Sequence, residues 1–275
     1  MQIHKRNAAA GWLWISQSVH LLIHHKVIGL AFFCTSLFLT KALLAVPVVG
    51  YILTTLLQPI LLASVFVMID TTTMGRPVSV AGVISEIRPH LSQLLRVGFA
   101  YAGVIVLSAG IVQMLTGNPV LAMAVAGDSV AFNKAISNEL TSVMYSAVLL
   151  AGIASAVLFF ASWFAPPLIL FRGCSAKAAM KQSLVAVGRN FKGFLLLGII
   201  LAGSWLGYFL MMYLLPGSIL TPIGRQDLLL PAVTLLSGLY WPIAGPIILA
   251  TVFVGYKDVF ETAPNSQAST KDSNG

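Results

Sequence analysis

The chain has 275 residues, of which 58% are hydrophobic and only 9% are charged, and its mean hydropathy is +0.91. Soluble domains carry roughly 25% charged residues, so this composition excludes an ordinary soluble protein and indicates that lipid surrounds most of the polypeptide. The net charge is +8, which in a soluble protein would point to nucleic acid. Cations gathered on one face of a membrane explain this charge better, and we expect no nucleic-acid partner.

Six segments are long and apolar enough to cross a bilayer as helices, which needs about 20 residues each. The sequence therefore predicts an all-α bundle forming one transmembrane domain over residues 1–260, followed by a disordered tail over 261–275. The first apolar window covers two passes, with a turn expected at Pro47–Gly50. The predicted spans are 27–47, 50–69, 97–115, 145–171, 193–215 and 232–256.

The cations are distributed unevenly around these spans. If both termini face the cytoplasm, thirteen of the sixteen Lys and Arg residues fall on that side, which is the bias of bacterial inner-membrane proteins. A single pass through 27–69 would place Arg76, Arg88 and Arg96 opposite Lys26 and remove the bias. The sequence thus predicts a multi-pass inner-membrane protein with both termini inside, whose cytoplasmic face contacts anionic lipid headgroups.

One lysine, Lys41, lies inside the first span. A lysine at the bilayer centre costs about 2.5–3.5 kcal/mol on insertion scales. Because Pro47 is only six residues further on, the side chain can extend to the outer surface. Snorkelling and contact with a substrate or ion both remain open for Lys41.

The sequence contains an internal similarity. Residues 59–66, PILLASVF, and residues 246–253, PIILATVF, agree at six of eight positions, and Gln17-Ser18 precedes one span as Gln182-Ser183 precedes another. A unit of one short helix and two spans would then occur three times, over 8–69, 78–171 and 175–256. Chance similarity between apolar strings is the alternative.

The repeated prolines, Pro59 and Pro246, interrupt the hydrogen-bond ladder of their helices. Ser64 and Thr251, each five residues after a proline, are candidate partners for the freed carbonyls. Two interpretations remain: a kink that serves packing, or a broken helix that lines a cavity.

Three short amphipathic helices are expected at the cytoplasmic interface. In the first, Gln17, His20 and His24 share a face, with apolar residues opposite and tryptophans at headgroup depth. We interpret the histidines as a solvated face, with adventitious metal binding as the alternative. In the last, Lys177 and Lys181 share a polar face suited to lipid phosphate, and the apolar stripe is formed by Met180, Leu184, Val187 and Phe191.

Small residues recur in the later spans, among them Gly203 and Gly207 as a GxxxG motif. We expect this motif to serve packing within the chain rather than dimerisation. A short helix is also expected over 129–140.

The sequence lacks the motifs of several kinds of catalytic or binding site. The sequence contains no phosphate-binding GxxxxGK[ST] and no HExxH, and no predicted span carries an Asp or Glu. The two cysteines, Cys34 and Cys174, form no CxxC pair. We therefore expect no enzyme activity, no cofactor and no resident metal.

Several segments resemble an uncharacterised family of proteobacterial six-helix inner-membrane proteins. The similar segments are Gly11–Trp14, Pro47–Gly50 with Pro59, Trp163–Phe171, Ser183–Asn190 and Gly255–Phe260. A looser similarity reaches the membrane domain attached to some glycerophosphodiester phosphodiesterases, whose catalytic domain is absent here. The resemblance implies the six-span architecture and no particular reaction.

These observations favour a non-enzymatic scaffold or accessory protein that contacts lipid or a membrane partner. A transporter or channel for a small or amphipathic solute, kinked at Pro59 and Pro246, is the second hypothesis. An enzyme using the face of His20 and His24 is the third.

Overall fold

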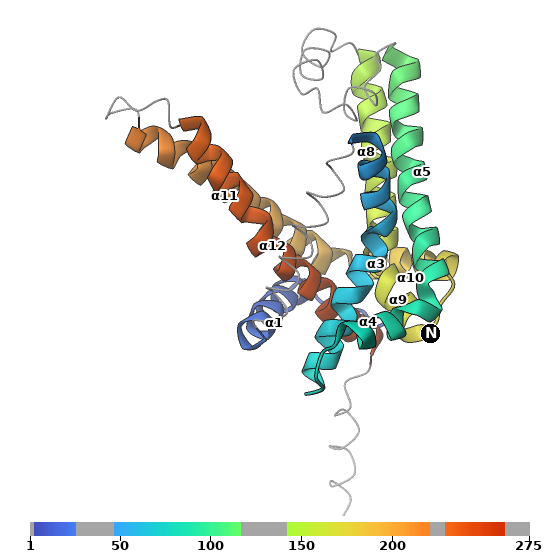
Figure 1. Ribbon diagram of the computed structural model, residues 1–275. Helices are drawn as coiled ribbons and strands as arrows, with labels where there is room; N and C mark the ends of the chain where they lie inside the picture. The colour runs from blue at the N-terminus through green and yellow to red at the C-terminus, as the bar shows by residue number, and fades with distance from the viewer. Residues whose placement is uncertain (1–2, 26–46, 117–141, 221–228, 262–275) are drawn as a thin grey trace, which may run out of the picture. The chain divides into compact units, whose positions relative to one another are not determined.

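The computed structural model describes residues 3–25, 47–116, 142–220 and 229–261 (Figure 1). Within these ranges the chain is helical and contains no strand, which confirms the all-α fold class for this part of the protein. The helices are α1 (Ala10–His24), α3 (Pro47–Thr73), α4 (Val80–Ile87), η1 (Arg88–His90), α5 (Leu91–Thr116), α8 (Ser142–Trp163), α9 (Ala165–Arg172), α10 (Ala176–Arg189), α11 (Phe191–Leu220) and α12 (Leu229–Phe260).

Three stretches among the described residues are long and apolar enough to cross a membrane: Leu53–Thr73, Gly152–Arg172 and Phe191–Met212. They overlap the predicted spans 50–69, 145–171 and 193–215. The predicted spans 97–115 and 232–256 fall within the helices α5 and α12. The predicted span 27–47 lies outside the described residues except for Pro47, so a total of six passes stays a prediction.

The chain divides into two compact units, each described here by itself. The first consists of residues 1–29 with 186–275, and the second of residues 30–185. The single domain expected over 1–260 therefore also stays a prediction.

In the first unit, α11 and α12 lie side by side, and α1 packs against both of them (Figure 1). Gly11 of α1 meets the backbone of Gly193 at the start of α11, where an added Cβ would lie 2.3 Å from the Gly193 carbonyl oxygen. Only a residue without a side chain allows this approach. The first helix of the sequence is thus fixed to its last two helices.

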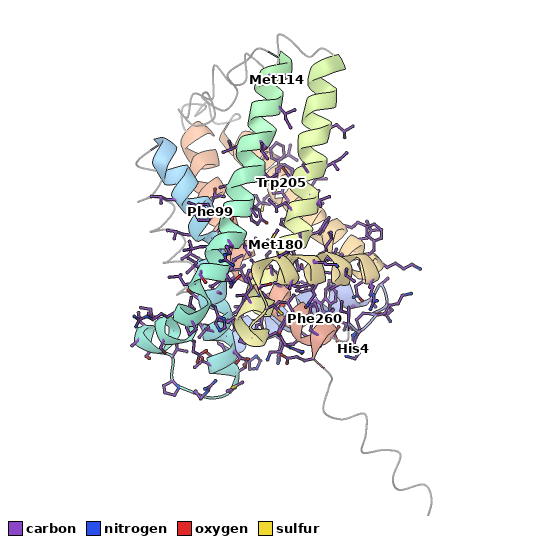
Figure 2. The ribbon with its side chains drawn as sticks, turned by 90° about the vertical axis from the view of Figure 1, so that its right-hand side faces the viewer. His4, Phe99, Met114, Met180, Trp205 and Phe260 are labelled. Carbon is purple, nitrogen blue, oxygen red and sulfur yellow. The ribbon has the colours of Figure 1, made fainter. Side chains whose placement is uncertain are left out.

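In the second unit, α5 packs between α3 and α8. Gly98 of α5 sits against the backbone of Leu56 in α3, with its notional Cβ 2.3 Å from the Leu56 carbonyl oxygen. Gly173 ends α9 in the left-handed conformation at φ 62°, which reverses the chain into α10. Figure 2 shows α10 running across the long helices α5 and α8 rather than along them.

Several predicted boundaries were wrong. The turn expected at Pro47–Gly50 is instead the first turn of α3, since proline fits the first helical position, where its missing N–H has no intrahelical partner. The helix α11 continues beyond the predicted span 193–215 and includes Pro216 near its end. The span predicted over 145–171 is interrupted at Phe164, between α8 and α9. The helix expected over 129–140 and the tail beyond Glu261 lie outside the described residues.

Candidate functional site

The predicted histidine face is present on α1. Gln17, His20 and His24 are all exposed, and the two imidazole rings lie 4.1 Å apart between centroids. The Nδ1 atom of His24 lies 2.8 Å from the carbonyl oxygen of His20. No group of three or more His, Cys, Asp or Glu side chains that could hold a metal occurs within the described ranges.

The two tryptophans of α1 differ in their surroundings. The side chain of Trp14 is 2% exposed and packs inside the first unit, whereas that of Trp12 is 56% exposed. The apolar stripe alone could not distinguish a face that meets lipid from one that meets protein. Trp14 packs edge-on against Phe194 of α11, with ring centroids 5.3 Å apart.

On α10, Lys177 and Lys181 are exposed on one face, as predicted. In the predicted apolar stripe, Val187 is buried, whereas Leu184 and Phe191 are exposed. The face that packs against protein consists mainly of small side chains, which permit close contact between helices. Its fully or nearly buried residues are Ala176, Ala179, Ser183 and Ala186.

Pro59 and Pro246 are buried within α3 and α12. Ser64 donates a hydrogen bond to the Ile60 carbonyl at 2.9 Å, and Thr251 donates one to the Ile247 carbonyl at 2.7 Å. Each hydroxyl thus donates to the backbone carbonyl of the residue that follows the proline.

The carbonyls that the prolines free belong to the residues four positions earlier, which are Thr55 and Pro242. The suggested role of Ser64 and Thr251 as partners of those freed carbonyls was therefore wrong. Lys41, the remaining predicted cavity residue, lies outside the described residues.

The first unit contains a polar cluster around Asp258, near the carboxyl end of α12. One carboxylate oxygen accepts a bond from the Arg6 guanidinium at 2.7 Å, and the other accepts the indole N–H of Trp14 at 2.9 Å. Arg6 also donates to the backbone carbonyl of Asp258 at 2.7 Å. Both carboxylate oxygens are satisfied, so the charge of Asp258 is neutralised by a residue 252 positions away in the sequence.

Asn190, which follows α10, fixes the backbone of the segment before α1. Its amide nitrogen donates to the His4 carbonyl at 3.1 Å, and its oxygen accepts the Arg6 backbone N–H at 2.6 Å. The His4 backbone N–H donates to the Val259 carbonyl at 2.9 Å. We call this set the terminal clasp: His4, Arg6, Trp14, Asn190 and Asp258.

The second unit contains a polar break between α8 and α9. The Ser183 hydroxyl donates to the Phe160 carbonyl at 2.8 Å and accepts the Phe164 N–H at 2.9 Å. In an unbroken helix these two backbone groups would bond each other. The hydroxyl therefore substitutes for one missing helical hydrogen bond, just before Pro166 and Pro167 remove the next donors.

One turn away, the hydroxyls of Tyr101 in α5 and Ser162 in α8 lie 2.6 Å apart, and Ser162 also donates to the Phe159 carbonyl. This pair links α5 to α8 close to the break. It is a second polar contact within a mostly apolar interface, where unsatisfied polar groups are costly.

Sequence reasoning did not assign roles to Arg6, Asn190 or Asp258. A signal was nevertheless available, because Trp14, Asn190 and Asp258 belong to the segments Gly11–Trp14, Ser183–Asn190 and Gly255–Phe260 that carry the family resemblance. The structure brings Trp14, Asn190 and Asp258 together in the first unit.

The fold and its polar contacts define an all-helical protein with features of a membrane protein, including three helices able to cross a bilayer. No protein-family model matches the chain, and neither a curated protein nor a solved structure matches it.

Proposed function

We propose that the protein is a non-enzymatic scaffold or accessory protein of the bacterial inner membrane, contacting lipid or a partner membrane protein. One observation carries this proposal: five buried polar side chains among the described residues bond the backbone of their own chain. They are Ser18, Ser162, Ser183, Asn190 and Thr251. Groups engaged in this way position helices rather than a substrate.

The proposed threading has six spans with both termini in the cytoplasm. It is supported by the bias of the cations and by the three membrane-length apolar stretches. The resemblance to the proteobacterial six-helix family supports the same arrangement. The short helices α1, α4 and α10 would lie at the cytoplasmic interface, where exposed apolar residues such as Trp12, Val80 and Ile84 meet lipid.

A threefold internal repeat underlies this proposal, and burial supports it. When Gln17-Ser18 is aligned with Gln182-Ser183, three of the four buried residues of α1 fall on buried residues of α10. The coinciding pairs are Gly11 with Ala176, Trp14 with Ala179, and Ser18 with Ser183. The two proline segments correspond in the same way, through buried Ala63 with Ala250, Val65 with Val252, and Phe66 with Phe253.

The packing of the short helices also supports the repeat. In the second unit, α4 packs on α3, and α10 binds the junction of α8 and α9 through Ser183. In the first unit, α1 packs on α12. Each short helix would thus pack on the last helix of the preceding copy. In the last copy, α1 takes the corresponding position against α12. The ion pair of Arg6 with Asp258 then fixes the segment before α1 to the end of the last copy.

Reporter fusions test the threading. Fusions within 76–88 and after Glu261 are expected to report the cytoplasm, while fusions within 216–227 are expected to report the periplasm. A periplasmic signal from the segment 76–88 would refute both the six-span threading and the repeat.

A transporter or channel is the second candidate, favoured by the two buried prolines Pro59 and Pro246 inside long helices. Flux assays on proteoliposomes separate the two proposals. The scaffold predicts solute and ion flux equal to that of protein-free vesicles. Flux that depends on the protein and is lost in P59A or P246A, with folding intact, would instead establish the transporter.

A further inference from the structure

The segment that contains α9, α10 and α11 is strongly unbalanced in charge. Between residues 140 and 226 the sequence has no Asp or Glu, but it has six cations. They are Arg172, Lys177, Lys181, Arg189, Lys192 and Arg225. Two of them, Lys177 and Lys181, are one turn apart on α10 and both are exposed.

The orientation of α10 is fixed by contacts on its other face. The backbone N–H of Ala176 donates to the side-chain oxygen of Gln93 at 2.9 Å, and Ser183 is inserted between the Phe160 carbonyl and the Phe164 N–H. Because Ala176 and Ser183 are held inward, Lys177 and Lys181 must point away from the second unit. The helix cannot rotate to hide them without breaking these bonds.

Apolar side chains continue the same outward face. Leu184 and Val185, one turn beyond Lys181, are 41% and 40% exposed. Cations followed by exposed aliphatic groups on one helix face match the boundary between lipid headgroups and acyl chains. Free phosphate or nucleic acid would satisfy the lysines but would leave Leu184 and Val185 in water.

We infer that the outward face of α10 (Lys177, Lys181, Leu184 and Val185) binds the phosphodiester group of an anionic membrane lipid. The two ammonium groups contact the phosphate, and the aliphatic side chains contact the upper acyl chain. This inference rests on the proposed membrane location and names the partner of that surface. The transverse course of α10 in Figure 2, across α5 and α8, suits a helix lying along a bilayer surface.

The test is a lipid titration of the full chain in detergent, followed by native mass spectrometry. Phosphatidylglycerol is compared with phosphatidylcholine. In K177Q/K181Q, phosphatidylglycerol affinity is expected to fall about 30-fold, since each lysine near an anionic surface contributes about fivefold. The affinity for phosphatidylcholine is expected to stay unchanged.

A matched control removes two other exposed cations of the second unit, in R76Q/R88Q. This variant is expected to keep its phosphatidylglycerol affinity within about twofold of the wild type, since neither arginine belongs to the outward face of α10. Equal losses in the two variants would show an effect of net charge and overturn the assigned surface. Unfolding curves of both variants check that the fold is intact.

A second arm distinguishes the source of the phosphate. Inorganic phosphate in excess is expected to leave phosphatidylglycerol bound, and L184S/V185S is expected to weaken lipid binding without changing the lysines. Full displacement by inorganic phosphate would overturn the lipid assignment. Reporter fusions remain the separate test of membrane threading, so failure of the lipid titration with correct threading would refute this inference alone.

Discussion

Trp14 donates its indole N–H to the Oδ2 atom of Asp258 at 2.9 Å, although 244 residues separate the two in the sequence. The carboxylate also binds Arg6, so a single acidic side chain holds both the segment before α1 and α1 itself against the carboxyl end of α12. The terminal clasp therefore connects the two ends of the chain within the first unit.

Replacing Trp14 by phenylalanine tests the indole hydrogen bond. W14F keeps an aromatic ring against Phe194 but removes the donor to Asp258. Because a hydrogen bond to a charged group contributes about 1.5–3 kcal/mol, we expect the free energy of unfolding to fall by about that amount. The measurement is unfolding of the purified protein in mixed micelles. The exposed Trp12 provides the control, and W12F is expected to change stability by less than about 0.5 kcal/mol.

A double-mutant cycle measures the ion pair of Arg6 with Asp258. Both side chains are about one-third exposed, at 35% and 33%, so the pair is only partly shielded from water. We expect R6Q and D258N to be coupled by about 1 kcal/mol in the free energy of unfolding.

The neighbouring pair of Lys257 with Glu261, at 3.1 Å, serves as the control for this cycle. It joins residues one turn apart in sequence, and we expect its coupling to be only about 0.3–0.5 kcal/mol. Coupling between Arg6 and Asp258 no larger than this would mean that the clasp does not hold the chain ends together.

Gly98 tests the close contact of α5 with α3. In G98A the added Cβ would lie 2.3 Å from the Leu56 carbonyl oxygen, so the two helices must separate. We expect a loss of about 1–3 kcal/mol in the free energy of unfolding, as for other overpacked contacts. Gly103, on the same helix, has nothing within 4 Å of its notional Cβ. G103A is expected to be neutral or slightly stabilising, and a loss equal to that of G98A would exclude the steric explanation.

The histidine face of α1 leads to a prediction about metal. His24 Nδ1 lies against the His20 carbonyl, and both side chains are exposed. Two ligands from one helix leave a metal ion largely hydrated, so we expect purified protein to contain no stoichiometric metal and H20A/H24A to unfold like the wild type. Elemental analysis after dialysis against chelator provides the measurement. A metal retained at one equivalent and lost in H24A would revive the enzyme hypothesis.

The sequence predicted the helices better than their contacts. Apolar length and helical spacing are local signals, and they located α1, α10 and the three membrane-length stretches. The contacts of Asp258 with Arg6 and Trp14 join distant parts of the chain, and such contacts leave no periodic pattern. The packed face of α10 was missed for another reason: Ala176, Ala179 and Ser183 are small rather than strongly apolar, so hydrophobicity alone did not identify it.

The GxxxG motif shows the same limit. Gly203 and Gly207 were expected to pack within the chain; among the described residues neither meets an atom within 4 Å of its notional Cβ, so this packing stays a prediction. The spacing of small residues identifies a surface able to approach another helix closely, but it does not identify the helix that does so.

Ser183 gives a test of the break between α8 and α9. In S183A the Phe160 carbonyl and the Phe164 N–H both lose their partner hydroxyl. Since buried unsatisfied polar groups cost about 1–3 kcal/mol, either stability falls by that amount or the two backbone groups bond each other and the helix straightens. Hydrogen exchange at the Phe164 amide separates these results: faster exchange indicates an open break, and unchanged exchange with restored stability indicates a straightened helix.

The control is Ser16, which is not fully buried and bonds the Leu13 carbonyl on its own helix. S16A leaves no buried group without a partner. If S183A matched S16A in both stability and exchange, the hydroxyl would have no part in holding α10 at the junction.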